Sequence, residues 1–211
     1  MTIKTKAKRI IDILSKEYPD AKTALNFSTP LELLIATILS AQCTDARVNI
    51  VTRDLFQKYP TLDDYVNASI EEFEQDIFST GFYRAKAKNI LQTAKLIKEK
   101  FGGEVPKKMD DLLSLSGVGR KTANCVLGNC FNIPGIVVDT HISRLSNRIG
   151  FINTKDPVKA EFELMKIIPK SKWIDYNHIL IEHGRKICKS QKPQCLSCVI
   201  NTYCDEYSRS K

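Results

Sequence analysis

The stretch L-L-S-L-S-G-V-G-R-K-T-A-N, residues 112–124, joins two helix-like segments through a short turn that contains glycine. Two glycines two positions apart allow the chain to reverse tightly between helices, because glycine adopts backbone angles that other residues avoid. Val118, between the glycines, can fill the gap that such a turn leaves. A helix can begin at Arg120, directly after the second glycine. We interpret the stretch as a helix–hairpin–helix; a plain connecting turn is the alternative that Gly-Val-Gly alone supports.

The predicted hairpin places backbone amides where an anion can bind. Without side chains, Gly117 and Gly119 let a phosphate approach the amides at the positive end of the following helix. Arg120 and Lys121 come next, which favours a grip on a nucleic-acid backbone that is independent of base sequence. Lys121 falls in the first turn, where the helix dipole disfavours an ammonium, and a neutral lysine amine can act as a nucleophile. A second phosphate contact is the alternative role for Lys121.

A second segment, V-V-D-T-H at residues 137–141, runs an apolar pair into an aspartate. Asp139 can cap the helix that follows, and the backbone amides of that helix would keep its carboxylate ionised. Taken alone, this pattern favours a helix cap and no further role.

Helical periodicity extends over nearly all of the chain, and no convincing run alternates apolar and polar residues. Thr29-Pro30-Leu31-Glu32 offers a cap, a proline at the first helical position and a glutamate at the third. Similar starts and several glycine stops divide the chain into about ten short helices. The sequence therefore predicts an all-α protein. The other starts are Thr61 with Asp64, Ser69 with Glu72, and Asp156-Pro157; the stops are Gly81, Gly102-Gly103, Pro134-Gly135 and Gly150.

Four of the seven cysteines follow the pattern C-x6-C-x2-C-x5-C near the end of the chain, at Cys188, Cys195, Cys198 and Cys204. The short loops between them can wrap one small inorganic centre, and four thiolates suit either an iron–sulfur cluster or a tetrahedral zinc. Loops of six and five residues differ from the paired short knuckles of zinc ribbons, which favours iron–sulfur. The other three cysteines fall on helical stretches, where we expect small buried hydrophobes.

Composition sets limits on the class of partner. The chain has 211 residues and a net charge of +8, an excess that suits a polyanionic partner such as DNA or RNA and equally a merely solvated lysine-rich surface. Lys189 and Lys192 lie in the loop between the first two cysteines of the pattern, where they can meet a phosphate or balance an anionic cluster. The longest apolar run, Leu33 to Leu39, is too short for a membrane span. We expect an intracellular protein with no membrane association and no structural disulfides.

Five segments together resemble the endonuclease III family, which comprises bifunctional DNA glycosylase/AP lyases of the helix–hairpin–helix superfamily. They are L-S-A-Q-C-T-D (39–45), G-F-Y-R-A-K-A (81–87), L-S-G-V-G-R-K-T-A (115–123), V-D-T-H (138–141) and the four-cysteine pattern. The resemblance covers nearly the whole chain in order, and the motifs together are very specific.

The resemblance implies a two-lobed, all-α helix–hairpin–helix DNA glycosylase fold. One lobe is a six-helix barrel domain at residues 22–133, with the hairpin at 109–130. The other, from residues 1–21 and 134–211, is a helical iron–sulfur cluster domain with a 4Fe-4S cluster on the four cysteines. The implied partner is duplex DNA that contains damaged bases or abasic sites. The chain is expected to be a monomer in the cytoplasm, on the nucleoid.

The resemblance also assigns roles in removing oxidised or ring-saturated pyrimidines. The damaged nucleotide is flipped out, and Lys121 attacks C1′ of its sugar with help from Asp139. A Schiff base forms, and β-elimination cuts the strand 3′ to the lesion. Gln42 fills the hole left by the base, and Phe82 is the opposing wedge. The expected phosphate contacts are Gly117, Val118, Gly119, Arg120, Lys189 and Lys192.

Some residues depart from the family pattern. The sequence also leaves two rival functions open. Ser116 replaces the usual hairpin proline, and Phe82 and Cys43 stand where leucine and alanine are frequent. One rival is an adenine glycosylase of the same superfamily, which lacks a lysine at the position of Lys121. The other is a non-catalytic DNA-binding module with structural zinc, for which the presence of both Lys121 and Asp139 would be a coincidence.

Overall fold

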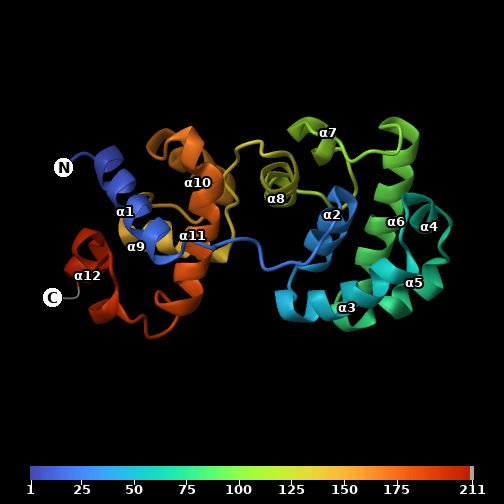
Figure 1. Cartoon of the computed structure of the whole chain (residues 1–211), viewed down its shortest axis with the longest axis horizontal. Coiled ribbons are helices and arrows are strands. Elements are labelled where there is room, and N and C mark those ends of the chain that lie inside the picture. The colour runs from blue at the N-terminus through green and yellow to red at the C-terminus, as the bar shows by residue number, and fades with distance from the viewer. Residues whose placement is uncertain (210–211) are drawn as a thin grey trace. The chain divides into compact units, whose positions relative to one another are not determined.

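The computed structural model describes residues 1–209, and these contain helices but no strand, which confirms the predicted all-α class. The chain divides into two compact units (Figure 1). The central unit spans Thr23–Ile133. The terminal unit combines Met1–Lys22 with residues 134–209, so the first and the last helix belong to the same unit.

The central unit packs its helices around an apolar core that includes Leu34, Phe73, Ile90 and Val126, all fully or almost fully buried. α2 is apolar on almost every face and packs against α3, α6 and α8. Because α2 lies inside the core, the apolar run that the sequence shows at 33–39 is explained by burial. The elements of this unit are α2 (Pro30–Leu39), α3 (Asp45–Lys58), α4 (Leu62–Asn67), α5 (Ile70–Asp76), the 3-10 helix η1 (Phe78–Thr80), α6 (Tyr83–Lys100), α7 (Met109–Leu113) and α8 (Arg120–Phe131).

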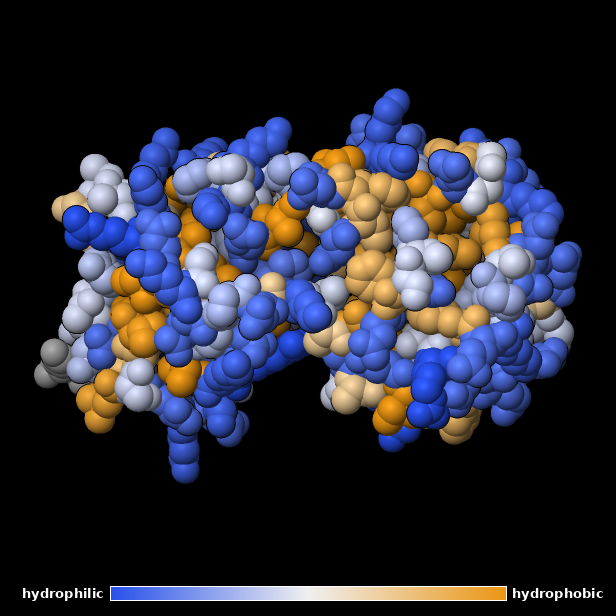
Figure 2. Space-filling model, viewed as in Figure 1, coloured by the Kyte–Doolittle hydropathy of each residue, from blue (hydrophilic) through white to orange (hydrophobic). Residues whose placement is uncertain are grey.

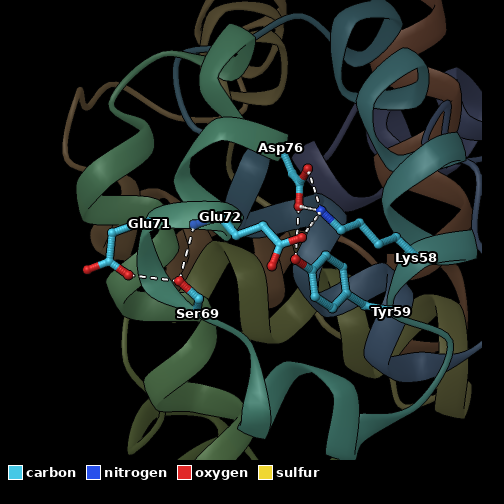
Figure 3. A network of polar contacts seen from close by, with 6 residues as sticks. All are labelled: Lys58, Tyr59, Ser69, Glu71, Glu72 and Asp76. Atoms are coloured by element: carbon cyan, nitrogen blue, oxygen red, sulfur yellow. Dashed lines mark hydrogen bonds and ion pairs between the residues drawn. The ribbon is translucent and has the colours of Figure 1, made fainter.

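A polar network ties the end of α3 to α5 (Figure 3). Lys58 Nζ lies 2.7 Å from both Glu72 Oε1 and Asp76 Oδ2, and Tyr59 OH donates to Asp76 Oδ2 at 2.9 Å. Burial of the ring and the bond to Asp76 raise the pKa of Tyr59 to about 12, so Tyr59 remains a donor. The network fixes α5 just before the chain turns into η1.

The terminal unit has its own core, formed by residues such as Ile10, Leu145 and Leu180. α11 packs against α9 and α1, and the hydroxyls of Ser146 and Tyr176 lie 2.7 Å apart inside this core. The elements are α1 (Ile3–Glu17), α9 (Thr140–Ile149), α10 (Pro157–Ile167), η2 (Lys170–Lys172), α11 (Trp173–Lys186), η3 (Cys195–Ser197), η4 (Asn201–Tyr203) and α12 (Asp205–Arg209).

The predicted helix starts are present. Thr29, Thr61, Ser69 and Asp156 each accept a hydrogen bond from the amide three residues later, and Thr61 with Asp64 forms a complete capping box. Ser69 caps α5 by accepting a hydrogen bond from the amide of Glu72, whereas the carboxylate of Glu72 pairs with Lys58.

Two expectations need correction. Residues 1–209 form twelve α-helices and four 3-10 helices rather than about ten helices, because elements of three to five residues are too short to show a hydrophobic period. Cys43 was expected on a helix, but it lies in the turn between α2 and α3 and is half-buried there.

Among the described residues, no helix is both long enough and apolar enough to cross a membrane. Hydrophilic side chains cover much of the visible face of each unit, and apolar side chains gather between them, most broadly on the central unit, at the right (Figure 2).

Candidate functional site

The hairpin between α7 and α8 is built around three buried apolar side chains. Leu112, Leu115 and Val118 are at most 7% exposed and belong to the core of the central unit. The amide of Val118 donates to the carbonyl of Leu115 at 3.3 Å. Val118 therefore supports the turn from inside, as its place between the glycines predicted. Thr93 Oγ1 of α6 donates to the carbonyl of Ser116 at 2.9 Å, which fixes the turn at that residue.

The two hairpin glycines face different surroundings. Gly117 has φ +74°, and a Cβ built there would lie 2.9 Å from the side chain of Asn89 on α6, so the fold itself requires glycine. Gly119 has φ −98° and ψ 176°, which any residue can adopt, and a Cβ there would meet no atom within 4 Å. Packing inside the protein thus gives no reason for glycine at position 119, and the space beside it is open to a ligand.

The N-terminus of α8 is suited to bind an anion. Gly119 is its N-cap and provides no side-chain hydrogen bond, and the first turn carries no acidic residue. The leading amides of a helix lack partners within the helix and carry partial positive charge. Lys121 is exposed at the second position of α8, and Arg120 is half-buried at the first.

Asp139 is the N-cap of α9 in the terminal unit. Its Oδ1 accepts from the amide of Ile142 at 2.8 Å, and its Oδ2 lies 3.5 Å from His141 Nδ1. The side chain is 17% exposed, so one face of the carboxylate still reaches solvent. Backbone amides stabilise the ionised form of a capping carboxylate. The sequence predicted this cap.

Asn177 of α11 orders the approach to Asp139, and nothing in the sequence singled it out. Its buried Oδ1 accepts from the amide of Val137 at 2.9 Å, and its Nδ2 donates to the carbonyl of Gly135 at 2.9 Å. A side-chain amide that pairs both its donor group and its acceptor with one segment fixes the position of that segment.

Gln42 and Phe82, predicted to contact DNA bases, occupy comparable places on two loops of the central unit. Gln42 lies in the turn after α2 with φ +53°, and Phe82 lies between η1 and α6 with φ +49°. Both side chains are exposed, and Phe82 is 67% exposed although it is a large apolar residue. A residue other than glycine that adopts a positive φ costs free energy, and such residues cluster at functional sites.

The four cysteines of the C-terminal pattern line one cavity in the terminal unit, together with Arg148, His183 and apolar side chains. Arg148 Nη1 lies 3.4 Å from the sulfur of Cys188, and His183 Nε2 lies 3.3 Å from the sulfur of Cys198. His183 is buried, which lowers its pKa to about 4 and keeps the ring neutral.

The same segment presents Lys189 and Lys192 on a closed loop. The amide of Gln194 donates to the carbonyl of Ile187 at 3.0 Å, and Arg148 donates to the carbonyl of Lys189 at 2.7 Å. Lys189 and Lys192 are exposed, and Lys192 has φ +49°. The loop is thus fixed at its base while both ammonium groups face solvent.

Comparison with known proteins places this geometry in a family. A family model described as HhH-GPD superfamily base excision DNA repair protein matches residues 35–170. Endonuclease III of Synechocystis is 48% identical over 202 residues, which cover 95% of this chain and 92% of that protein. Endonuclease III of Escherichia coli strain K12 is 43% identical over 202 residues, covering 95% and 96%. This chain belongs to the endonuclease III family.

Solved structures of endonuclease III agree with this assignment. A non-covalent endonuclease III–DNA complex and a trapped endonuclease III–DNA covalent intermediate each match with a TM-score of 0.94 and 47% identity, over 100% of this chain and 99% of theirs. A thermostable thymine-DNA glycosylase, 24% identical with a TM-score of 0.86, shares the fold. As an endonuclease III family member, the chain is a base excision DNA glycosylase and AP lyase.

Proposed function

We propose that this member of the endonuclease III family removes oxidised or ring-saturated pyrimidines from duplex DNA and cuts the strand 3′ to the resulting abasic site through Lys121. The observation that carries the proposal is the position of Lys121, which is exposed in the first turn of α8. It closely follows Gly119, the N-cap of this helix, which has open space beside it and provides no side-chain hydrogen bond. An adenine glycosylase of the same superfamily would have no lysine here.

The chemistry requires a neutral amine and a nearby negative charge. Nζ of Lys121 forms a bond to C1′ while the glycosidic bond breaks and its electron pair leaves with the base. As an ionised carboxylate, Asp139 first stabilises the positive charge that develops on the sugar, and it then accepts the proton that Nζ loses once the bond to C1′ has formed. Ring opening gives a Schiff base between Nζ and C1′. Loss of a proton from C2′ then expels the 3′ phosphate, and water releases the enzyme.

Extrusion of the damaged base is assigned to the two exposed loop residues of the central unit. Phe82 can enter the base stack as an apolar wedge, and Gln42 can occupy the vacated position with one amide donor and one amide acceptor. Because Gln42 can pair with several orphaned bases, we expect broad tolerance of the opposite base. Saturated pyrimidines stack poorly, so flipping them costs less free energy than flipping a normal base.

The cysteine cavity is proposed as the site of a 4Fe-4S cluster. All four cysteines of the pattern line it. Four thiolates around one cavity can hold a cluster, and the loops of six and five residues between the cysteines differ from the paired short knuckles of zinc ribbons. The cluster would cross-link the segment that carries Lys189 and Lys192.

Binding to DNA is proposed to rest on phosphates. The hairpin amides at Gly117 and Gly119, the side chain of Arg120, and the two lysines of the cluster segment would each meet the backbone rather than base edges. We assign the hairpin and barrel role to residues 22–133 and the cluster role to residues 1–21 and 134–211. We further propose that the protein acts as a monomer in the cytoplasm, on the nucleoid.

Borohydride trapping on abasic duplex DNA tests the central claim. The reductant should convert the Schiff base into a stable protein–DNA adduct in the wild type, and Lys121→Gln should bind the same duplex but form no adduct. Equal trapping by Lys121→Gln would remove Lys121 from the mechanism. Faster release of adenine opposite 8-oxoguanine than of thymine glycol, under single-turnover conditions, would replace the pyrimidine proposal with the adenine glycosylase.

A further inference from the structure

Lys86 is a buried cation that the proposed chemistry does not use. It lies in the first turn of α6 and is 4% exposed. Its Nζ donates to the carbonyl of Leu39 and to the carbonyl of Thr80, each at 2.8 Å. Burial lowers the pKa of Lys86, and its electrostatic interaction with Cys43 acts on that pKa in the opposite direction. Carbonyl dipoles thus take the place of a carboxylate partner.

The two carbonyls end separate elements of the central unit. Leu39 is the last residue of α2, where helix carbonyls lack an amide partner and carry partial negative charge. Thr80 is the last residue of η1. Leu39 is 47 positions from Lys86 in sequence and Thr80 is 6, so one ammonium joins a distant helix end to a local turn.

Each of these ends lies two or three positions before an exposed residue with positive φ. Gln42, with φ +53°, follows Leu39 by three positions, and Phe82, with φ +49°, follows Thr80 by two. Gly81 between Thr80 and Phe82 also has positive φ. Such conformations persist only when surrounding contacts over-determine them. Lys86 supplies a contact at the base of both loops.

We propose that Lys86 is a positioning residue for base extrusion, which holds the loops at 40–44 and 81–82 so that Gln42 and Phe82 enter the base stack together. This inference rests on the wedge role proposed for those two residues. It requires Lys86 to act on the opening of the duplex and not on the bond changes at Lys121. The two steps can be measured separately, because a preformed abasic site presents no base to extrude.

The test compares two substrates for Lys86→Met, which keeps the length of the side chain and removes its charge and donors. Single-turnover excision of thymine glycol from duplex DNA should slow about 10- to 100-fold, the scale of a misplacement near 1 Å. Strand cutting at a preformed abasic site should stay within about 3-fold of the wild type. Lys98→Met makes the same change at the far end of α6, where Lys98 pairs with Asp63, and should alter neither rate.

A double-mutant cycle with Phe82→Ala separates positioning from general support of the fold. If Lys86 acts through the loops, Lys86→Met should slow excision much less in the Phe82→Ala background than in the wild type. Additive losses, equal slowing on both substrates, or unchanged excision would each overturn the inference.

Two further controls keep the outcome decisive. Should Lys86→Met fail to fold, Lys86→Gln, which removes the charge but keeps N–H donors, is judged by the same comparison of the excision rate with the rate of cutting at an abasic site. The other control is Phe82→Ala itself, which could leave the rate of thymine glycol excision unchanged relative to the rate of cutting at an abasic site. That result would reject the wedge role in the proposed function, and the inference about Lys86 with it. A selective loss in Phe82→Ala without one in Lys86→Met would reject only the role of Lys86.

Discussion

Substitution of each hairpin glycine by alanine should separate folding from DNA binding. At position 117 the backbone has φ +74°, where an alanine costs about 1–2 kcal/mol. The new Cβ would also lie 2.9 Å from the side chain of Asn89, which must move away. We expect Gly117→Ala to lower the free energy of unfolding by about 2–3 kcal/mol, or the melting temperature by about 5–10 °C in a chain of this size.

At position 119 the same change should leave stability almost intact. The backbone there is extended, and a Cβ has no neighbour within 4 Å. Reduced freedom of the unfolded chain stabilises by about 0.4–1 kcal/mol, while alanine is a poorer N-cap than glycine by a similar amount. The added methyl would however stand beside the leading amides of α8. Loss of one charge-assisted hydrogen bond to a phosphate should weaken DNA binding about 10- to 100-fold.

Thermal melting and fluorescence anisotropy with a duplex that carries a stable abasic analogue measure the two effects. We predict opposite profiles: Gly117→Ala melts at a lower temperature than the wild type, whereas Gly119→Ala melts like the wild type but binds the duplex weakly. Wild-type affinity in Gly119→Ala would refute the role of its open surface in phosphate binding. A melting temperature as low as that of Gly117→Ala would show that packing, not a ligand, requires glycine there.

Three further predictions concern the cofactor, the cluster segment and the wedge. The purified protein should be yellow-brown with about four irons and four labile sulfides per chain; stoichiometric zinc in colourless, active protein prepared without oxygen would reject the cluster. Lys189→Ala and Lys192→Ala should each weaken binding to all duplexes alike and reduce the salt slope by about 1, and an unchanged slope in both would exclude phosphate contacts. Phe82→Ala should slow excision from stacked duplex far more than cutting at a preformed abasic site, measured in single-turnover assays on both substrates; equal slowing would argue against a wedge.

Features encoded by neighbouring residues could be read from the sequence. The caps at Thr29, Thr61 and Asp139 each depend on an amide three positions away, so spacing alone predicted them. The hairpin followed from two glycines and the valine between them. Sequence motifs likewise marked the four cysteines as one group, because their loops are short.

Contacts between distant segments could not be read in this way. Lys86 looks like any basic residue of an amphipathic helix, and only the packing of α2, η1 and α6 shows that it is buried with two carbonyl partners. Asn177 lies about 40 positions from the segment that it holds. Cys43 was expected on a helical stretch, whereas α2 ends at Leu39 and Cys43 lies in the turn that follows.

The sequence by itself therefore predicted where several helices start and suggested the residues to which we assign the chemistry, since both depend on residue type and on spacings of a few positions. The tertiary structure decided which glycine serves the fold and which is open to a ligand, and which buried lysine supports the exposed loops. Burial and hydrogen bonding across tens of residues depend on how helices pack, and one-dimensional patterns do not record that packing.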